Sequence, residues 1–259
     1  MSLRSTAGEG DGPLLDSDSG GWCCRCGVVH SLPVRPAIKD GLHLMGQLCR
    51  HQRIDWLVPE RFRDPRCDTR CLFDKAGGKM FGVLSCRDTG GKRIVLRAFS
   101  GQYNGLWQVE GWVGPVFDVA AFGALVGEPE REIKRLGREL TALPHGSSAR
   151  QLLRAQRRTL SRQLMERVHC LYQLVNFRGA TQPLPRVFIG NGAPPSGTGD
   201  CCGPKLLHHA ARHGLRPEAM AEFYWGASNA SGTKVQGRFY PACAAKCQPI
   251  LGFLLCGLP

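Results

Sequence analysis

Cysteines in the C-terminal third of the sequence have the spacing of metal ligands. Cys201 and Cys202 open one predicted helix, while Cys243 and Cys247 open another. A thiolate at a helix N-terminus is stabilised by the helix dipole and by a bound metal, and a spacing of four residues places two sulfurs on one helix face. We therefore expect a zinc site here. Three protein ligands plus water would make it catalytic and four would make it structural; buried thiols without a metal are the alternative.

Two carboxylates are candidates to act as a general base on a zinc-bound water. Asp200 directly precedes the first cysteine pair, and Glu222 lies in an apolar segment at residues 219–225. A carboxylate within hydrogen-bond reach of such a water can take its proton. An Asp before a helix is more commonly its N-cap, and this is the role that we prefer for Asp200.

A second cysteine motif lies near the N-terminus. Cys23, Cys26 and His30 have the spacing C-x-x-C-x-x-x-H, which resembles one half of a zinc ribbon or knuckle. Cys67 and Cys71 could supply the other half, and a thiol cluster without metal is the alternative. Four single cysteines have apolar neighbours, which favours core packing: Cys49, Cys86, Cys170 and Cys256.

The 259-residue chain is basic, with 34 Lys and Arg against 21 Asp and Glu, a net charge of +13. Such an excess favours a polyanionic partner, because neutralised phosphates release counterions. Four arginines cluster in a predicted helix at residues 151–175 or just before it, where RNA contact and a solvated helix face are equally good interpretations: Arg150, Arg154, Arg157 and Arg158.

Aromatic side chains alternate with cations in the C-terminal segment, as suits base stacking and phosphate contact. Core packing explains part of this set, so we expect Tyr224 or Trp225, and not both, to face the site. The candidates for RNA contact in this segment are Lys205, Tyr224, Trp225, Lys234 and Arg238.

Periodicity and turn residues give the expected elements. We predict a helix at 39–56, a β-hairpin at 79–100, and an antiparallel pair of helices at 128–140 and 151–175. A short strand at 186–189, a helix at 202–213, a strand at 219–225 and a helix from 241 follow. The fold class is thus α+β or α/β: a mixed sheet with a β-hairpin, a protruding antiparallel helical hairpin and a C-terminal strand–helix–strand–helix layer.

The same elements divide the chain into five segments. Residues 1–20, rich in Gly, Ser and Asp, are expected to be a disordered leader, and 21–60 to hold the Cys/His knuckle and a helix. The β-hairpin part of the main domain covers 61–127, the basic helical hairpin 128–178 and the cysteine-site part 179–259. The sequence has neither a signal peptide nor a run of about 20 apolar residues. It therefore predicts a cytoplasmic protein with no membrane partner.

Several longer motifs carry a family resemblance. They are GKMFGVL (78–84), AFSGQYNG (98–105), PVFD (115–118), NFRG (176–179), GTGDCCGPKLL (197–207), AMAEFYWG (219–226), GRFYPAC (237–243) and KCQPILGFLL (246–255). In this order they resemble the N-terminal extension of RluA-family pseudouridine synthases that act on tRNA and 23S rRNA, over residues 61–259. The synthase domain of that family carries its nucleophile in an H-R-L-D motif, which this sequence lacks. The resemblance thus implies an RNA-linked accessory module and not pseudouridylation by this chain.

A fainter similarity is to the zinc deaminase fold. There a helix opens with a His or Cys ligand, a Glu follows two residues later, and a second helix supplies two cysteines. Cys201, Cys243 and Cys247 occur in that order, but the Glu would fall at Gly203 and the second pair is one residue wider.

Three functions follow from these patterns. The first is a zinc-binding, RNA-associated accessory protein linked to tRNA or rRNA modification. The second is a deaminase-like zinc hydrolase that acts on a nucleobase, with Asp200 or Glu222 as the essential carboxylate. The third is a protein-interaction partner of a separate RNA-modifying enzyme.

Overall fold

The computed structural model describes residues 18–74, 77–229 and 231–258. Its centre is a four-stranded antiparallel sheet in the order β4-β3-β7-β8, built from β3 (Lys79–Arg87), β4 (Arg93–Phe99), β7 (Arg216–Trp225) and β8 (Phe239–Tyr240). The predicted β-hairpin is confirmed as β3 and β4, which pair from Phe81–Phe99 to Arg87–Arg93. The α+β prediction is also confirmed, since every pairing between these strands is antiparallel.

Alternation along the strands gives the sheet two cores. On one face Leu84 and Met220 pack with α5 (Cys202–Arg212) and α6 (Gln248–Leu255). On the other face Val83 and Phe223 pack with α1 (Arg35–His51). Successive side chains of a strand point to opposite faces, so these neighbouring positions separate the two layers of helices.

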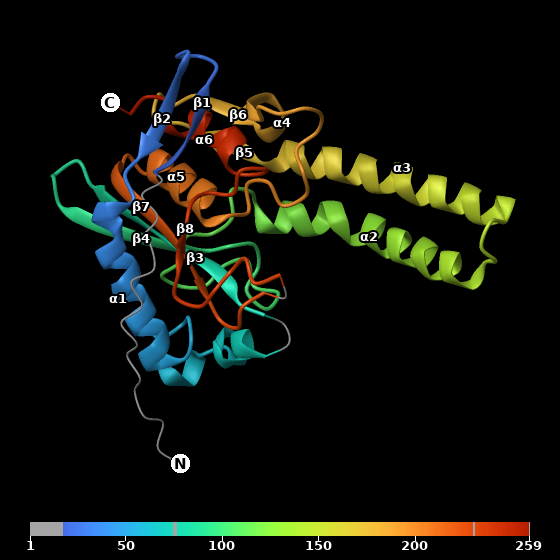
Figure 1. Ribbon diagram of the computed structural model, residues 1–259, viewed down its shortest axis with the longest axis horizontal. Helices are drawn as coiled ribbons and strands as arrows, with labels where there is room; N and C mark the ends of the chain where they lie inside the picture. The colour runs from blue at the N-terminus through green and yellow to red at the C-terminus, as the bar shows by residue number, and fades with distance from the viewer. Residues whose placement is uncertain (1–17, 75–76, 230, 259) are drawn as a thin grey trace.

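A long helical hairpin extends away from the sheet (Figure 1) and consists of α2 (Val119–Ala142) and α3 (Ser148–Leu171). Asp118 caps α2 by accepting a hydrogen bond from the Ala121 amide at 2.7 Å. The predicted helical hairpin is present, but α2 starts nine residues earlier than expected. Pro129 lies inside it and does not end it.

Smaller elements complete the chain and lie around the sheet. They are β1 (Ser19–Cys23), β2 (Val28–Leu32), three short 3-10 turns (Glu60–Phe62, Pro65–Cys67 and Arg70–Phe73), β5 (Gln173–Val175), β6 (Thr181–Pro183) and α4 (Leu184–Val187). The strand predicted at 186–189 is wrong, because these residues complete and follow α4. The leader predicted at 1–20 falls mainly outside the described residues, and β1 begins at Ser19. No helix in the described ranges is both long and apolar enough to cross a bilayer.

Candidate metal centre and basic hairpin

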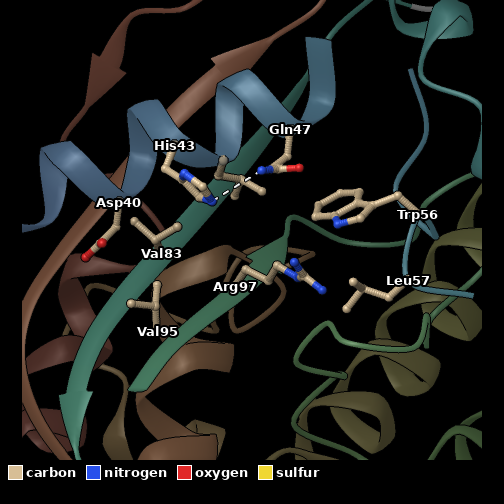
Figure 2. A pocket seen from close by; sticks show the side chains of 9 residues that line it. Asp40, His43, Gln47, Trp56, Leu57, Val83, Val95 and Arg97 are labelled. Atoms are coloured by element: carbon tan, nitrogen blue, oxygen red, sulfur yellow. Dashed lines mark hydrogen bonds between the residues drawn. The ribbon is translucent and has the colours of Figure 1, made fainter. Parts of the chain in front are cut away.

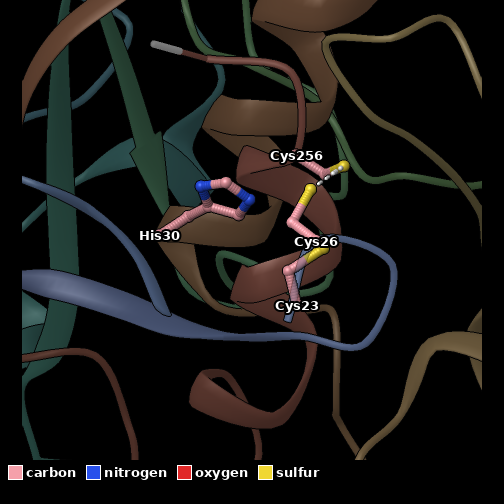
Figure 3. Close-up of side chains that lie close together, drawn as sticks. All are labelled: Cys23, Cys26, His30 and Cys256. Carbon is pink, nitrogen blue, oxygen red and sulfur yellow. Dashed lines mark hydrogen bonds between the residues drawn. The ribbon is translucent and has the colours of Figure 1, made fainter. Parts of the chain in front are cut away.

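Four potential metal ligands gather where β1, β2 and α6 meet. The ligand atoms of Cys23, Cys26, His30 and Cys256 all lie within 4.8 Å of one another (Figure 3). The Sγ atoms of Cys26 and Cys256 are 3.5 Å apart. Zinc holds thiolates at about 2.3 Å in a tetrahedron, which separates their sulfurs by about 3.8 Å. The spacing and the Cys3His donor set therefore fit a four-coordinate zinc site.

The β1–β2 hairpin positions three of these ligands. Cys23 ends β1, and the turn after it closes with a hydrogen bond from the Gly27 amide to the Cys23 carbonyl at 2.9 Å. Gly27 has a φ of 66°, which favours glycine. His30 lies on β2 opposite Gly21. The C-x-x-C-x-x-x-H spacing thus corresponds to one tight hairpin whose ligands come from the strand, the turn and the returning strand.

Close backbone packing brings the fourth ligand from the far end of the chain. A side chain on Gly21 would overlap the backbone of α6 at Gln248, and one on Gly252 would overlap the backbone of β1 at Trp22. Two glycines thus let β1 and α6 touch along their backbones. Cys23 lies two residues after Gly21, and Cys256 lies four residues after Gly252. The close contact between β1 and α6 therefore places both thiols at the same end of these two elements.

The electrostatics of the site favour a thiolate at Cys23, whereas burial and the neighbouring thiols raise the pKa of Cys256. Nε2 of His30 is buried and has no hydrogen-bond partner among the described residues, which leaves a lone ring nitrogen for a metal or a proton. Burial raises the pKa of Cys23, but the amides of Cys26 and Arg25 and the neighbouring thiols outweigh it, so the pKa is lowered overall. The Arg178 guanidinium hydrogen-bonds the Cys256 and Cys26 thiols, and these contacts raise the pKa of Arg178. This cation offsets part of the charge of three thiolates.

The structure corrects the expected second half of this motif. Cys67 and Cys71 lie in the 3-10 turns after α1, where Cys71 donates to the Asp68 carbonyl at 3.1 Å. Burial raises the pKa of Cys67 to about 12, as expected for a core thiol. Cys256, which we had assigned to core packing, takes the place expected for this pair. A single sequence shows the two glycines but not that they face each other.

The C-terminal cysteines do not form a comparable group. Cys202 is buried against the sheet, where its thiol donates to the Met80 carbonyl at 3.5 Å. Cys247 contacts the Cys201 thiol, a contact that together with burial raises its pKa. Cys243 is exposed and precedes α6, which begins only at Gln248. Within the described parts of the chain, three or more ligand atoms come within 4.8 Å only around Cys23. The helix-face argument for Cys243 and Cys247 therefore does not apply.

The two candidate carboxylates occupy different surroundings. Asp200 is not the N-cap of α5, a position that Cys201 holds, and its Oδ1 accepts a hydrogen bond from the Tyr172 hydroxyl at 2.8 Å. Glu222 is buried on β7 and its Oε1 accepts from the Gly203 amide at 3.2 Å. Burial raises the pKa of Glu222 to about 7, so near neutral pH this side chain can both hold and release a proton.

Three of the residues expected to contact RNA instead donate hydrogen bonds to backbone carbonyls of the protein. Lys205 is fully buried and donates to the carbonyls of Phe99 and Gly101 at 3.0 and 2.8 Å. Tyr224 is buried and its hydroxyl donates to the Ala227 carbonyl. Arg150 donates to the Leu140 and Leu143 carbonyls, so it closes the end of α2.

The remaining cations and Trp225 stay near the surface. Trp225 is partly exposed, and its ring makes an edge contact with the Phe73 ring, the two ring centroids being 6.2 Å apart. The Lys234 ammonium lies 3.6 Å from the Tyr240 ring centroid, and Arg238 is exposed. Lys234 and Arg238 are therefore more accessible than Lys205, a difference that no local feature of the sequence indicates.

The basic charge of the helical hairpin lies almost entirely on α3. That helix carries six arginines and one glutamate, whereas α2 carries four basic and four acidic residues. On α2, Lys134 pairs with Glu130 at 3.1 Å, and Arg135 pairs with Glu132 at 2.6 Å and also with Glu139.

On α3 five exposed arginines have no acidic partner among the described residues, namely Arg167 near the end of the helix and four others before it: Arg154, Arg157, Arg158 and Arg162. We call these four the α3 arginine face. Arg154, Arg158 and Arg162 are spaced four residues apart, so they share one side of the helix. Arg157 lies against Gly137 of α2.

No protein-family model, curated protein or solved structure matches this chain.

Proposed function

We propose that this protein is an RNA-binding accessory protein whose terminal elements are held together by a structural zinc ion. The observation that carries RNA binding is the α3 arginine face: four exposed guanidinium groups without carboxylate partners on a hairpin that projects from the body. The similarity of residues 61–259 to the extension of RluA-family synthases supports a link to tRNA or rRNA modification.

The zinc is assigned a structural and not a catalytic role. Cys23, Cys26, His30 and Cys256 offer four protein ligands, and a tetrahedral site with four protein ligands has no open position for a substrate. These ligands join the first β-hairpin to the segment after α6, so the metal would tie together two regions that are 230 residues apart in sequence at Cys26 and Cys256.

The α3 arginine face suits a polyanion better than it suits an internal structural role. Arg154, Arg158 and Arg162 follow one another at about 6 Å along the helix axis, so three of them can lie along one strand of phosphates. On α2 two of the four cations, Lys134 and Arg135, are paired with glutamates, whereas Arg131 and Arg138 have no ion pair among the described residues. The net positive charge of the hairpin thus lies on α3, because the basic and acidic residues of α2 are equal in number.

A matched pair of variants tests RNA binding. Arg154→Gln with Arg158→Gln removes two positive charges from α3, and Lys134→Gln with Arg135→Gln removes two from α2. Affinity for tRNA and for an rRNA fragment is measured by fluorescence anisotropy from 50 to 300 mM salt. We expect the α3 variant to bind more weakly and to lower the slope of log K against log salt by about 2. The α2 variant should change little. Equal losses in both variants, or no binding by the wild type, would refute the proposal.

One observation favours a second function, a base deaminase. In deaminases the catalytic Glu lies two residues after the first metal ligand. In this chain Gly203 holds that position. A Cβ on Gly203 would lie 3.0 Å from Oε1 of Glu222, so β7 delivers a carboxylate to the place where that side chain would begin. This function also needs a metal on Cys201, Cys243 and Cys247, whose ligand atoms would have to move closer together.

Product analysis separates the two functions. The zinc-loaded protein is incubated with cytidine, adenosine and RNA, and uridine and inosine are quantified by mass spectrometry. A deaminase forms one of these products, and Glu222→Gln abolishes it while RNA binding persists. If neither product appears, this second function is rejected and the RNA-binding proposal is unaffected.

A further inference from the structure

A pocket of about 430 Å³ lies between α1 and the exposed part of the sheet, on the face opposite α5 and α6 (Figure 2). Its floor is formed by Val83 of β3 and Val95 of β4, and its apolar walls by Leu44 of α1 and Leu57 of the following loop. Arg97 and Asp40 are its charged lining residues. The volume falls in the range of sites that take one small molecule.

Arg97 is held in place by a backbone carbonyl and by two tryptophan rings. Its Nε donates to the Gly111 carbonyl at 2.7 Å, and its guanidinium carbon lies 4.4 and 5.2 Å from the ring centroids of Trp56 and Trp112. Among the described residues, Arg97 makes no ion pair with a carboxylate. A partly buried guanidinium without a carboxylate favours an anion that can form charge-assisted hydrogen bonds with it.

The carboxylate in the pocket does not neutralise Arg97. Asp40 is paired with Arg93 at 2.5 Å, and it accepts a hydrogen bond from the Ser85 hydroxyl at 2.5 Å. Its charge is therefore already balanced by neighbours on β3 and β4. The pocket thus has one unpaired positive charge, Arg97, beside an apolar floor. Its negative group, Asp40, is already paired with Arg93.

From this arrangement we infer that the pocket binds a small free organic anion with an apolar body. The anionic group, a carboxylate or a sulfonate, contacts the Arg97 guanidinium. The apolar body covers Val83 and Val95, and Leu44 and Leu57 enclose it. This site is separate from the metal centre and from the α3 arginine face, so it does not depend on the proposed function.

The probe for this site is 8-anilinonaphthalene-1-sulfonate, an apolar anion whose fluorescence rises on binding. The neutral analogue N-phenyl-1-naphthylamine lacks the sulfonate. We expect one probe per chain, at least ten-fold weaker binding to Arg97→Gln, and unchanged binding to Lys92→Gln, which removes one charge from the β3–β4 turn. The neutral analogue should bind the wild type at least ten-fold more weakly than the sulfonate does. Its affinity for Arg97→Gln should equal its affinity for the wild type.

A second variant keeps the test valid if Arg97→Gln disturbs the packing of the two tryptophans. Val95 is 41% exposed, so Val95→Glu places a negative charge in the pocket without burying it in the core. This variant, checked for folding by near-UV circular dichroism, should also lose the probe. The inference is overturned if the wild type fails to bind, if folded Val95→Glu retains wild-type affinity, or if the neutral analogue binds as tightly as the sulfonate.

Discussion

Gly252 of α6 packs directly on the backbone of Trp22 in β1, so closely that a side chain at Gly252 would overlap the Trp22 carbonyl. Gly21 makes the reciprocal contact with the backbone of α6. The Cys3His group depends on this approach, because Cys23 and Cys256 lie just beyond it on the two elements. The candidate metal ligands are thus positioned by two residues that have no side chain.

Replacing Gly252 should therefore separate the ligands. In an open helix position Gly→Ala is favourable by about 1 kcal/mol, but Gly252→Ala must push α6 away from β1. We expect a lower melting temperature and weaker zinc retention against a chelator. The control is Gly46→Ala on α1, where a Cβ meets nothing within 4 Å; it should be neutral or stabilising. If both variants behave alike, close packing does not position the site.

The sequence predicted elements with strong periodicity and turn residues. The β3–β4 hairpin has the Asp88-Thr89-Gly90-Gly91 turn, and α2 and α3 have apolar stripes that meet in the hairpin. Their ends were less certain. The helix expected from residue 128 begins at Val119 and passes through Pro129, because apolar residues before the proline, such as Leu125 and Val126, also pack on the core.

Long-range contacts could not be predicted in the same way. Cys23, Cys26 and His30 are recognisable from their close spacing in the sequence, while Cys256 is brought to them only by tertiary packing. Likewise nothing local distinguishes Lys205, which is buried, from Lys234, which is partly exposed. The burial of a charged side chain depends on which carbonyls the fold presents to it.

Removal of Cys256 tests the composition of the metal centre. Cys256→Ser should lower the zinc content from one ion per chain to a small fraction of that, measured by plasma mass spectrometry after dialysis against a weak chelator. Cys67→Ser and Cys71→Ser should leave the zinc content unchanged, because both thiols lie outside the group. Loss of zinc in these two variants and not in Cys256→Ser would restore the assignment first made from the sequence.

Two arginines on α3 should have different roles, Arg150 in stability and Arg154 in RNA binding. Arg150 donates to the last carbonyls of α2, so Arg150→Ala should lower the free energy of unfolding by about 1–2 kcal/mol through loss of these charge-assisted bonds. Arg154 is exposed, so Arg154→Ala should leave stability within about 0.5 kcal/mol and weaken RNA binding. Urea unfolding and anisotropy measure the two effects. A stable Arg150→Ala protein would show that the capping contact contributes little.

Glu222 should make stability depend on pH with a defined sign. Burial raises its pKa from 4.5 to about 7 in the folded protein. Between these values the folded chain holds a proton that the unfolded chain has released, so the contribution of Glu222 to stability falls as the pH rises through this window. A shift of this size corresponds to about 3 kcal/mol.

The variant Glu222→Gln imitates the protonated carboxyl and keeps the acceptor for the Gly203 amide. Urea unfolding at pH 4.5 and pH 8 should show it close to wild type at the lower pH and more stable at the higher pH. Glu218→Gln on the same strand is the control, because its carboxylate pairs with Arg87 at 2.7 Å; it should gain no stability at pH 8. If Glu222→Gln is no more stable than wild type at pH 8, the ionised carboxylate is accommodated in the core.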